Sequence, residues 1–192
     1  MSINLPTALT WVRILMIPLL IALYEIPAQW LGMPSRNLWA TILFAAAAVT
    51  DWLDGYLARR LNQTSAFGAF LDPVADKLMV AAALIVLVEL ERTGAWVAAI
   101  IIGREIAISA LREWMAQVGS ARSVAVNMLG KIKTVSQMVA IPLLLYDQPL
   151  GPVPVREWGG FLILLAALLT LVSMVYYMKL ALPGLRGAPP KG

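Results

Sequence analysis

The sequence predicts an all-α membrane protein, a single domain over residues 1–192 with six transmembrane helices and both termini on the cytoplasmic side. Its 192 residues are 60% hydrophobic and 14% charged, whereas soluble domains carry about 25% charged residues. The chain has no cysteine and no histidine, which excludes disulfides, thiol nucleophiles, Cys/His zinc sites and imidazole catalysis. Any chemistry must therefore depend on carboxylates, cations and hydroxyls.

Six apolar runs are long enough for transmembrane helices, because the roughly 30 Å hydrocarbon core of a bilayer needs about 20 apolar residues. They lie at about 8–25, 38–60, 70–90, 95–116, 132–147 and 157–179. Turn-forming residues separate them at 27–35, 62–65, 92–94, 119–123 and 149–154. The first run contains Arg13 and Pro18 and has no basic segment before it, so we expect it to remain as a helix rather than to be cleaved as a signal peptide.

The orientation of the helices follows from the basic residues, which are enriched in cytoplasmic loops. With the N-terminus inside, the cytoplasmic side receives nine of them: Arg59, Arg60, Arg112, Arg122, Lys131, Lys133, Lys179, Arg186 and Lys191. The opposite side receives only Arg36, Arg92 and Arg156. This bias predicts a multi-pass membrane protein with both termini on the cytoplasmic side. Because the net charge of +4 is spread along the loops, anionic lipids and phosphorylated substrates are expected partners, and nucleic acid is not.

Four aspartates lie in the second and third apolar runs. Asp51, Asp54, Gly55 and Ala58 follow the spacing i, i+3, i+4, i+7, which places them on one face of a helix. Gly68, Asp72 and Asp76 are spaced by four in the next run. A short connection makes these two helices antiparallel neighbours, so we expect the four carboxylates to converge at the cytoplasmic end of the pair.

Carboxylates in a membrane need a compensating charge, since each costs at least about 2.5–3.5 kcal/mol on insertion scales. Arg59 and Lys77 are too few to neutralise four acids, whereas one or two divalent cations with oxygen ligands would do so. Two magnesium or manganese ions would suit a displacement at phosphorus. Each residue taken alone also has a structural interpretation: an acid at a helix end, small residues for helix packing, or Asp72 capping a helix that begins at Pro73.

The segment from Asp51 to Asp76 reads DWLDGYLARRLNQTSAFGAFLDPVAD. It matches the signature of the CDP-alcohol phosphotransferase family, D-x2-D-G-x2-A-R-x8-G-x3-D-x3-D, at every fixed position. Further stretches, NLPTALTWVR, REIAISALREWMA and GKIKT, resemble the bacterial branch of that family that makes phosphatidylglycerophosphate. The resemblance covers nearly the whole chain and is weakest at residues 147–158 and in the tail.

The resemblance implies a metal-dependent reaction in which an alcohol attacks the β-phosphorus of a CDP-lipid and CMP leaves. By motif position, Asp51, Asp54 and Asp72 ligate metal, and Asp76 both ligates and removes the proton of the attacking hydroxyl. The residues that resemble those lying against CDP-diacylglycerol are Gly55, Ala58, Arg59 and Gly68, with Asn4, Thr7, Thr10 and Arg13 as second-rank ligands. Asn4 and Thr7 could instead cap the first helix, and Arg13 could extend to the membrane interface. The family also suggests a homodimer.

The acceptor is predicted from a cluster of cations. Arg104 and Arg112 are eight residues apart on one side of the fourth run, and Lys131 and Lys133 open the fifth. Such cations beside an acidic metal site can bind a second phosphate, which glycerol 3-phosphate carries and serine or choline does not. These cations could otherwise express only the cytoplasmic bias, and Glu105 and Glu113 could pair with the arginines.

We therefore expect transfer of the phosphatidyl group of CDP-diacylglycerol to glycerol 3-phosphate. One alternative is a phosphatidyltransferase of the same family with another acceptor, such as phosphatidylglycerol, inositol phosphate or serine. A second, from a different class, is a small cation transporter in which intramembrane aspartates carry ions. The position of the acids toward one face, and the glycines and alanines between them, argue against a transporter.

Overall fold

The computed structural model describes residues 5–61, 66–117 and 128–187. Within these ranges it contains six helices: α1 Leu5–Glu25, α2 Met33–Leu61, α3 Ala66–Glu89, α4 Ala95–Gln117, α5 Met128–Tyr146 and α6 Val155–Gly187. A helix lies at each of the six predicted apolar runs, although α2, α3 and α5 begin four or five residues before the runs do. Polar residues extend the helices because backbone hydrogen bonding does not depend on the hydropathy of the side chains.

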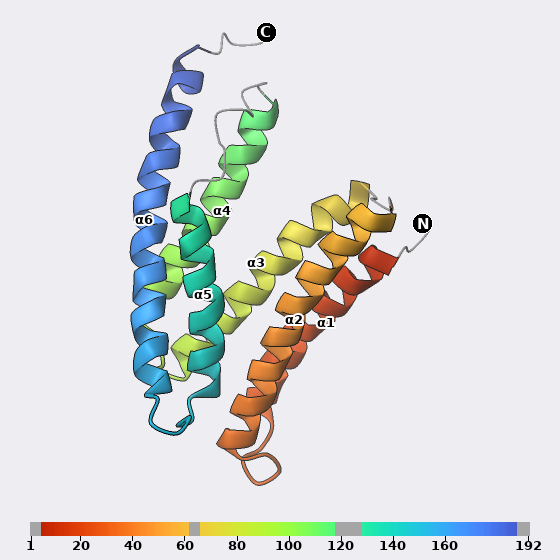
Figure 1. Cartoon of the computed structure of the whole chain (residues 1–192), viewed down its shortest axis with the longest axis vertical. Coiled ribbons are helices and arrows are strands. Elements are labelled where there is room, and N and C mark those ends of the chain that lie inside the picture. Colours follow the sequence, from red (N-terminus) through yellow and green to blue (C-terminus); the bar gives the residue numbers. More distant parts are fainter. Residues whose placement is uncertain (1–4, 62–65, 118–127, 188–192) are drawn as a thin grey trace.

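The helices form two groups that diverge toward one end (Figure 1). α1, α2 and α3 pack together in one group, and α4, α5 and α6 form the other. Contacts of α3 with α4 and α5, and of α2 with α5, join the groups. We call the end where the groups separate, and where α1 begins and α6 ends, the open end, and the other the closed end. The open end holds the C-terminal part of α2 and the N-terminal part of α3, which carry the four aspartates.

The core is apolar and draws on every helix. Its most deeply buried members, each at most 2% exposed, include Leu20, Phe44, Leu84, Ile101, Ile141 and Ile163. Small residues let neighbouring helices approach, as Ala40, Ala47 and Ala83 do within the same cluster. This packing fixes the helix positions below the open end.

The outer surface of the bundle is also apolar. Leu15, Phe70, Ile85 and Leu168 are each more than half exposed, as expected for side chains that contact lipid. Within the described residues, two helices are long and apolar enough to cross a membrane, through Ala8–Glu25 and Val155–Met178. The charged residues of the candidate site interrupt the apolar runs of α2, α3 and α4.

Two buried arginines connect helices at the closed end. Arg92 donates to the carbonyl oxygens of Leu144 and Leu145 at the end of α5 (3.0 and 2.8 Å) and pairs with Asp147 (3.2 Å). It also donates to the side-chain oxygen of Asn37 on α2 (2.9 Å), and so ties the two groups together. Arg36 caps α1 in the same manner through the carbonyl of Tyr24 (3.2 Å). Helix C-termini leave such carbonyls unpaired, so these buried arginines satisfy them.

The predicted capping role of Asp72 is wrong. α3 begins at Ala66, so Asp72 and Pro73 lie inside the helix and not in its first turn. Proline at this position has no N–H to donate to the carbonyl four residues before it, yet the helix continues through it. Asp72 therefore does not cap α3, and its side chain contacts α1 instead, as described below.

Candidate active site

Arg13 is the central cation of the aspartate region. It lies on α1 and is 1% exposed; its Nη1 is 2.7 Å from Oδ1 of Asp51, and its Nη2 donates to Oδ2 of Asp54. The expectation that Arg13 extends to the membrane interface is therefore wrong. The two acids are one turn apart on α2, so a single planar guanidinium reaches both. Asp54 is buried, whereas the side chain of Asp51 is 43% exposed and open to the solvent side.

The aspartates of α3 lie beside this cluster. Thr10, three residues before Arg13 on α1, donates a hydrogen bond from its hydroxyl to Oδ1 of Asp72. The carboxylate of Asp54 lies near enough to those of Asp51 and Asp72 for their charges to interact. The carboxylate of Asp76 interacts with that of Asp51 in the same way. The structure thus brings all four predicted aspartates to the same part of the open end.

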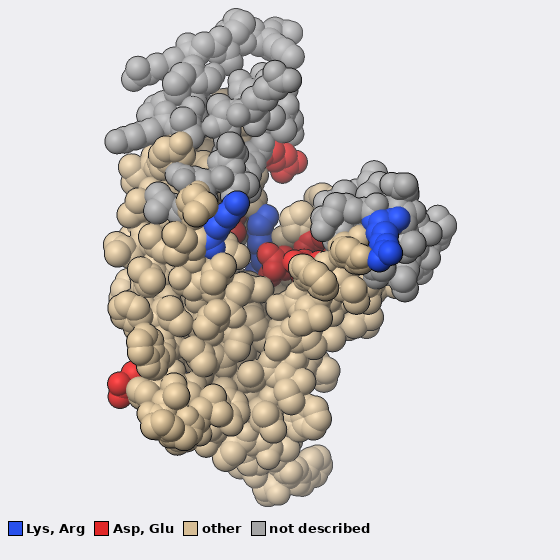
Figure 2. Space-filling model, viewed as in Figure 1, with Lys and Arg blue, Asp and Glu red and all other residues tan. Residues whose placement is uncertain are grey.

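A cavity opens between the two groups of helices at this point. It has a volume of about 140 Å³, and its lining consists of Asp51, Asp76, Lys77, Val80, Glu105, Lys133, Thr134, Gln137 and Met138. Figure 2 shows acidic and basic side chains gathered in a hollow between the two limbs of the molecule. The cavity is therefore bounded by acids of α2 and α3 on one side and by charged and polar residues of α4 and α5 on the other.

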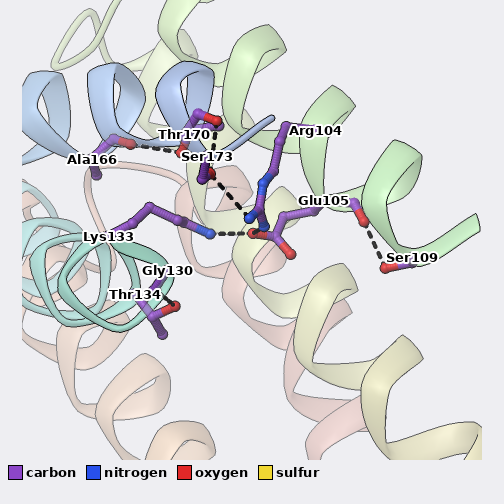
Figure 3. Close-up of polar contacts among 9 residues, drawn as sticks. All are labelled: Arg104, Glu105, Ser109, Gly130, Lys133, Thr134, Ala166, Thr170 and Ser173. Atoms are coloured by element: carbon purple, nitrogen blue, oxygen red, sulfur yellow. Dashed lines mark hydrogen bonds and ion pairs between the residues drawn. The ribbon is translucent and has the colours of Figure 1, made fainter. Parts of the chain in front are cut away.

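The opposite wall is built around Glu105 of α4 (Figure 3). Lys133 of α5 donates from Nζ to Oε1 of Glu105, and Nη1 of Arg104 lies 3.2 Å from the same oxygen. Arg104 also donates to the hydroxyl of Ser173 on α6 (3.2 Å) and stacks over the ring of Tyr177 at 5.7 Å. Both cations are less than 10% exposed. They are held in place before any ligand arrives.

The predicted phosphate-binding cations differ in position. Lys133 lines the cavity, whereas Arg104 contacts the lining residue Glu105. Lys131 is exposed, because a residue two positions from Lys133 on a helix points elsewhere. Arg112 lies on α4, but its side chain is outside the described part of the structure.

The residues predicted to contact CDP-diacylglycerol lie mostly where side chains are not described. Gly68 is buried in α3. Four others lie in helices but have side chains outside the described part of the structure: Gly55, Ala58 and Arg59 in α2, and Thr7 in α1. Asn4 lies outside the described residues.

The donor set suits a divalent cation. Asp51 and Asp76, from two different helices, line one cavity, and Asp54 and Asp72 are adjacent; carboxylate oxygens are the ligands that magnesium and manganese prefer. Among the described residues, no three acidic side chains are arranged to hold an ion, since Arg13 bridges Asp51 and Asp54 and Thr10 holds Asp72. The carboxylate ligands therefore fit a divalent metal ion. In this structure the guanidinium of Arg13 lies between two of them, those of Asp51 and Asp54.

Two features of the site were missed from the sequence. Glu105, expected only as a structural partner of the arginines, contacts both Arg104 and Lys133 in one wall of the cavity. Gln137 also lines the cavity and follows Lys133 by four residues, the spacing that places both on one helix face. That spacing was the only available signal.

Comparison with known proteins agrees with the signature. The model of the CDP-alcohol phosphatidyltransferase family matches residues 3–176. Proteins of Salmonella choleraesuis and of Escherichia coli, both named CDP-diacylglycerol–glycerol-3-phosphate 3-phosphatidyltransferase, are each 47% identical to this chain over 184 residues. The alignments cover 94% of this chain and 96% of each relative. The chain, with its aspartates at the open end of a six-helix bundle, therefore belongs to the CDP-alcohol phosphatidyltransferase family.

Proposed function

We propose that this protein transfers the phosphatidyl group of CDP-diacylglycerol to glycerol 3-phosphate, giving phosphatidylglycerophosphate and CMP. The observation that carries the proposal is the similarity over 94% of the chain to relatives named for this reaction. The cavity adds a physical reason, because Asp51 and Asp76 line it together with the buried Lys133. A phosphorylated alcohol needs both: a base for its hydroxyl and a cation for its phosphate.

In this mechanism, Asp76 takes the proton from the C1 hydroxyl of glycerol 3-phosphate. The hydroxyl oxygen forms a bond to the β-phosphorus of CDP-diacylglycerol, and the bond from that phosphorus to the oxygen of CMP breaks. Asp51, Asp54, Asp72 and Asp76 would hold divalent cations, magnesium or manganese and two in number, which neutralise the diphosphate when bound. The base must be a carboxylate because the chain has no histidine, and Asp76, the base by motif position, lines the cavity.

Lys133 and Arg104 bind the phosphate of the acceptor. Both are buried, and both already contact Glu105, so their positions are set before the phosphate enters. An arginine offers two parallel donors to a phosphate, and a lysine offers a mobile point charge. Lys131 and Arg112 would be further phosphate-binding cations.

The membrane arrangement belongs to the same proposal. All six helices cross a bacterial inner membrane, with both termini and the open end on the cytoplasmic side, and the enzyme is a homodimer. The large apolar residues on the outside of the bundle support contact with lipid along its length. Glycerol 3-phosphate is water-soluble, so a cavity at a cytoplasmic end gives it access.

The test is CMP release by the purified protein with CDP-diacylglycerol and magnesium. Glycerol 3-phosphate should support turnover, whereas inositol phosphate, serine and phosphatidylglycerol should not. Asp76→Asn should lower kcat at least about a hundredfold, because the general base is lost. Glu89→Gln, at the exposed closed end of the same helix, is the matched control and should retain activity. Turnover with another alcohol would keep the reaction class and reject the acceptor.

A further inference from the structure

Gln137 holds a buried hydrogen-bonding group that the fold leaves without a partner. Its residue is 4% exposed, and its side-chain oxygen Oε1 accepts no hydrogen bond within the described part of the structure. Buried polar atoms in proteins are nearly always paired, and an unpaired one is costly. Such an atom in the wall of a cavity is a sign of a ligand that completes it.

The neighbours of Gln137 define which ligand group it would meet. Lys133 lies one turn before it on α5, and both residues line the cavity with Asp76. The cavity, about 140 Å³, is well above the roughly 10–15 Å³ needed for one water, so it can admit a small polar molecule. One small space is thus lined by a lysine, by carboxylates and by a glutamine whose amide oxygen has no partner in the described part of the structure.

Glycerol 3-phosphate carries three polar groups in a row. Its phosphate suits Lys133, and the hydroxyl at the far end must reach Asp76 to react. The middle hydroxyl takes no part in the transfer, and a buried oxygen without a donor is the kind of group that recognises it. A hydroxyl can donate to the amide oxygen and accept from another group at once.

We propose that Gln137 accepts a hydrogen bond from the middle, non-reacting hydroxyl of the acceptor and so determines specificity for a glycerol backbone. This inference rests on the proposed function, since it assigns a position to a part of that substrate. Gln137 acts on binding and orientation and exchanges no proton. The reacting hydroxyl is fixed toward Asp76 when the phosphate and the middle hydroxyl are both held.

The experiment compares two acceptors that differ only in this hydroxyl: glycerol 3-phosphate and 3-hydroxypropyl phosphate. In the wild-type protein, kcat/KM for glycerol 3-phosphate should exceed that for the analogue by about tenfold or more, the effect of one well-made hydrogen bond. In Gln137→Met, which keeps the length of the side chain without its amide, the ratio should fall to within about twofold of one. In Gln137→Glu, an acceptor oxygen remains, so the preference should persist while repulsion of the phosphate raises KM for both acceptors.

Thr134→Val is the matched control. Thr134 lines the same cavity, but its hydroxyl already donates to the carbonyl of Gly130 (2.9 Å), so this variant should keep the wild-type ratio. A purely structural role for Gln137 would lower kcat/KM for both acceptors equally and leave the ratio unchanged, which would overturn the inference. An unchanged ratio with normal turnover of glycerol 3-phosphate rejects the role of Gln137 alone. If the wild-type protein did not use glycerol 3-phosphate, the proposed function and this inference would both be rejected.

Discussion

Arg13 is buried beside two carboxylates, and its positive charge compensates their negative charge. At 1% exposure it contacts Asp51 and Asp54, and Asp54 is itself buried. An ion pair of this kind contributes little beyond a well-packed apolar replacement, but removing one partner leaves a buried charge uncompensated. The aspartates therefore depend on Arg13 whenever no divalent cation is bound.

Arg13→Met should destabilise the metal-free protein by about 3 kcal/mol, the lower part of the range for breaking a buried ion pair, because Asp51 is partly exposed. Added magnesium should raise the midpoint of thermal unfolding in detergent more for this variant than for the wild type, since the ion supplies the missing positive charge. Arg60→Met, a change of an exposed arginine on α2, should have little effect on stability. Equal stability of Arg13→Met and the wild type without divalent cations would contradict this account.

The two lysines at the start of α5 should have unequal roles. Lys133 is 3% exposed in the cavity, and Lys131 is exposed outside it. Lys133→Gln should therefore raise KM for glycerol 3-phosphate by about tenfold, with a smaller change in KM for CDP-diacylglycerol. Lys131→Gln should have the weaker effect of the two. Steady-state kinetics with each substrate varied in turn checks this order, and a larger effect at Lys131 would place the phosphate nearer the mouth of the site.

At the scale of the helices, α5 and α6 are in tight contact at Gly159. A Cβ atom added there would lie 2.8 Å from Cγ of Leu144 and 3.0 Å from its Cδ2. Leu144 is 1% exposed in the core and has no room to move away. The next residue, Gly160, has no such neighbour within 4 Å. Substituting each of these two glycines in turn therefore distinguishes an effect on helix packing from an effect on helix propensity.

Gly159→Ala should lower the free energy of unfolding by about 1–3 kcal/mol, because overpacking forces the two helices apart. Gly160→Ala should be at least as stable as the wild type, since alanine favours a helix by up to about 1 kcal/mol over glycine. Unfolding midpoints of both variants in the same detergent make the comparison. If the two substitutions had the same effect, close contact at Gly159 would not matter.

At the scale of the whole molecule, the parts that could be predicted from the sequence are those set by neighbouring residues. Each apolar run became a helix, and the spacing of Asp51 with Asp54 placed both on one face. Contacts between distant segments could not be predicted in this way. Thr10 reaches Asp72 across 62 positions and Arg13 reaches Asp54 across 41, and no periodicity reports such pairs. The unpaired oxygen of Gln137 is likewise a property of its packed surroundings.

The proposed topology makes a prediction that the absence of cysteine renders simple to test. If all six helices cross the membrane, Ala28 and Val153 lie on its periplasmic side, and Met128 lies on its cytoplasmic side. If only α1 and α6 crossed, the whole segment between them would lie on one side, and all three positions would behave alike. A single cysteine introduced at each position is the only thiol in the chain, and all three residues are exposed on the protein surface.

A membrane-impermeant maleimide added to intact spheroplasts should label Ala28→Cys and Val153→Cys. Met128→Cys should react only after the membrane is permeabilised, because its position at the start of α5 belongs to the open end. Labelling of all three from outside would reduce the number of crossings to two and place the cavity outside the cytoplasm. Labelling of Met128→Cys alone would invert the topology, and glycerol 3-phosphate would then have to reach the aspartates from the opposite side.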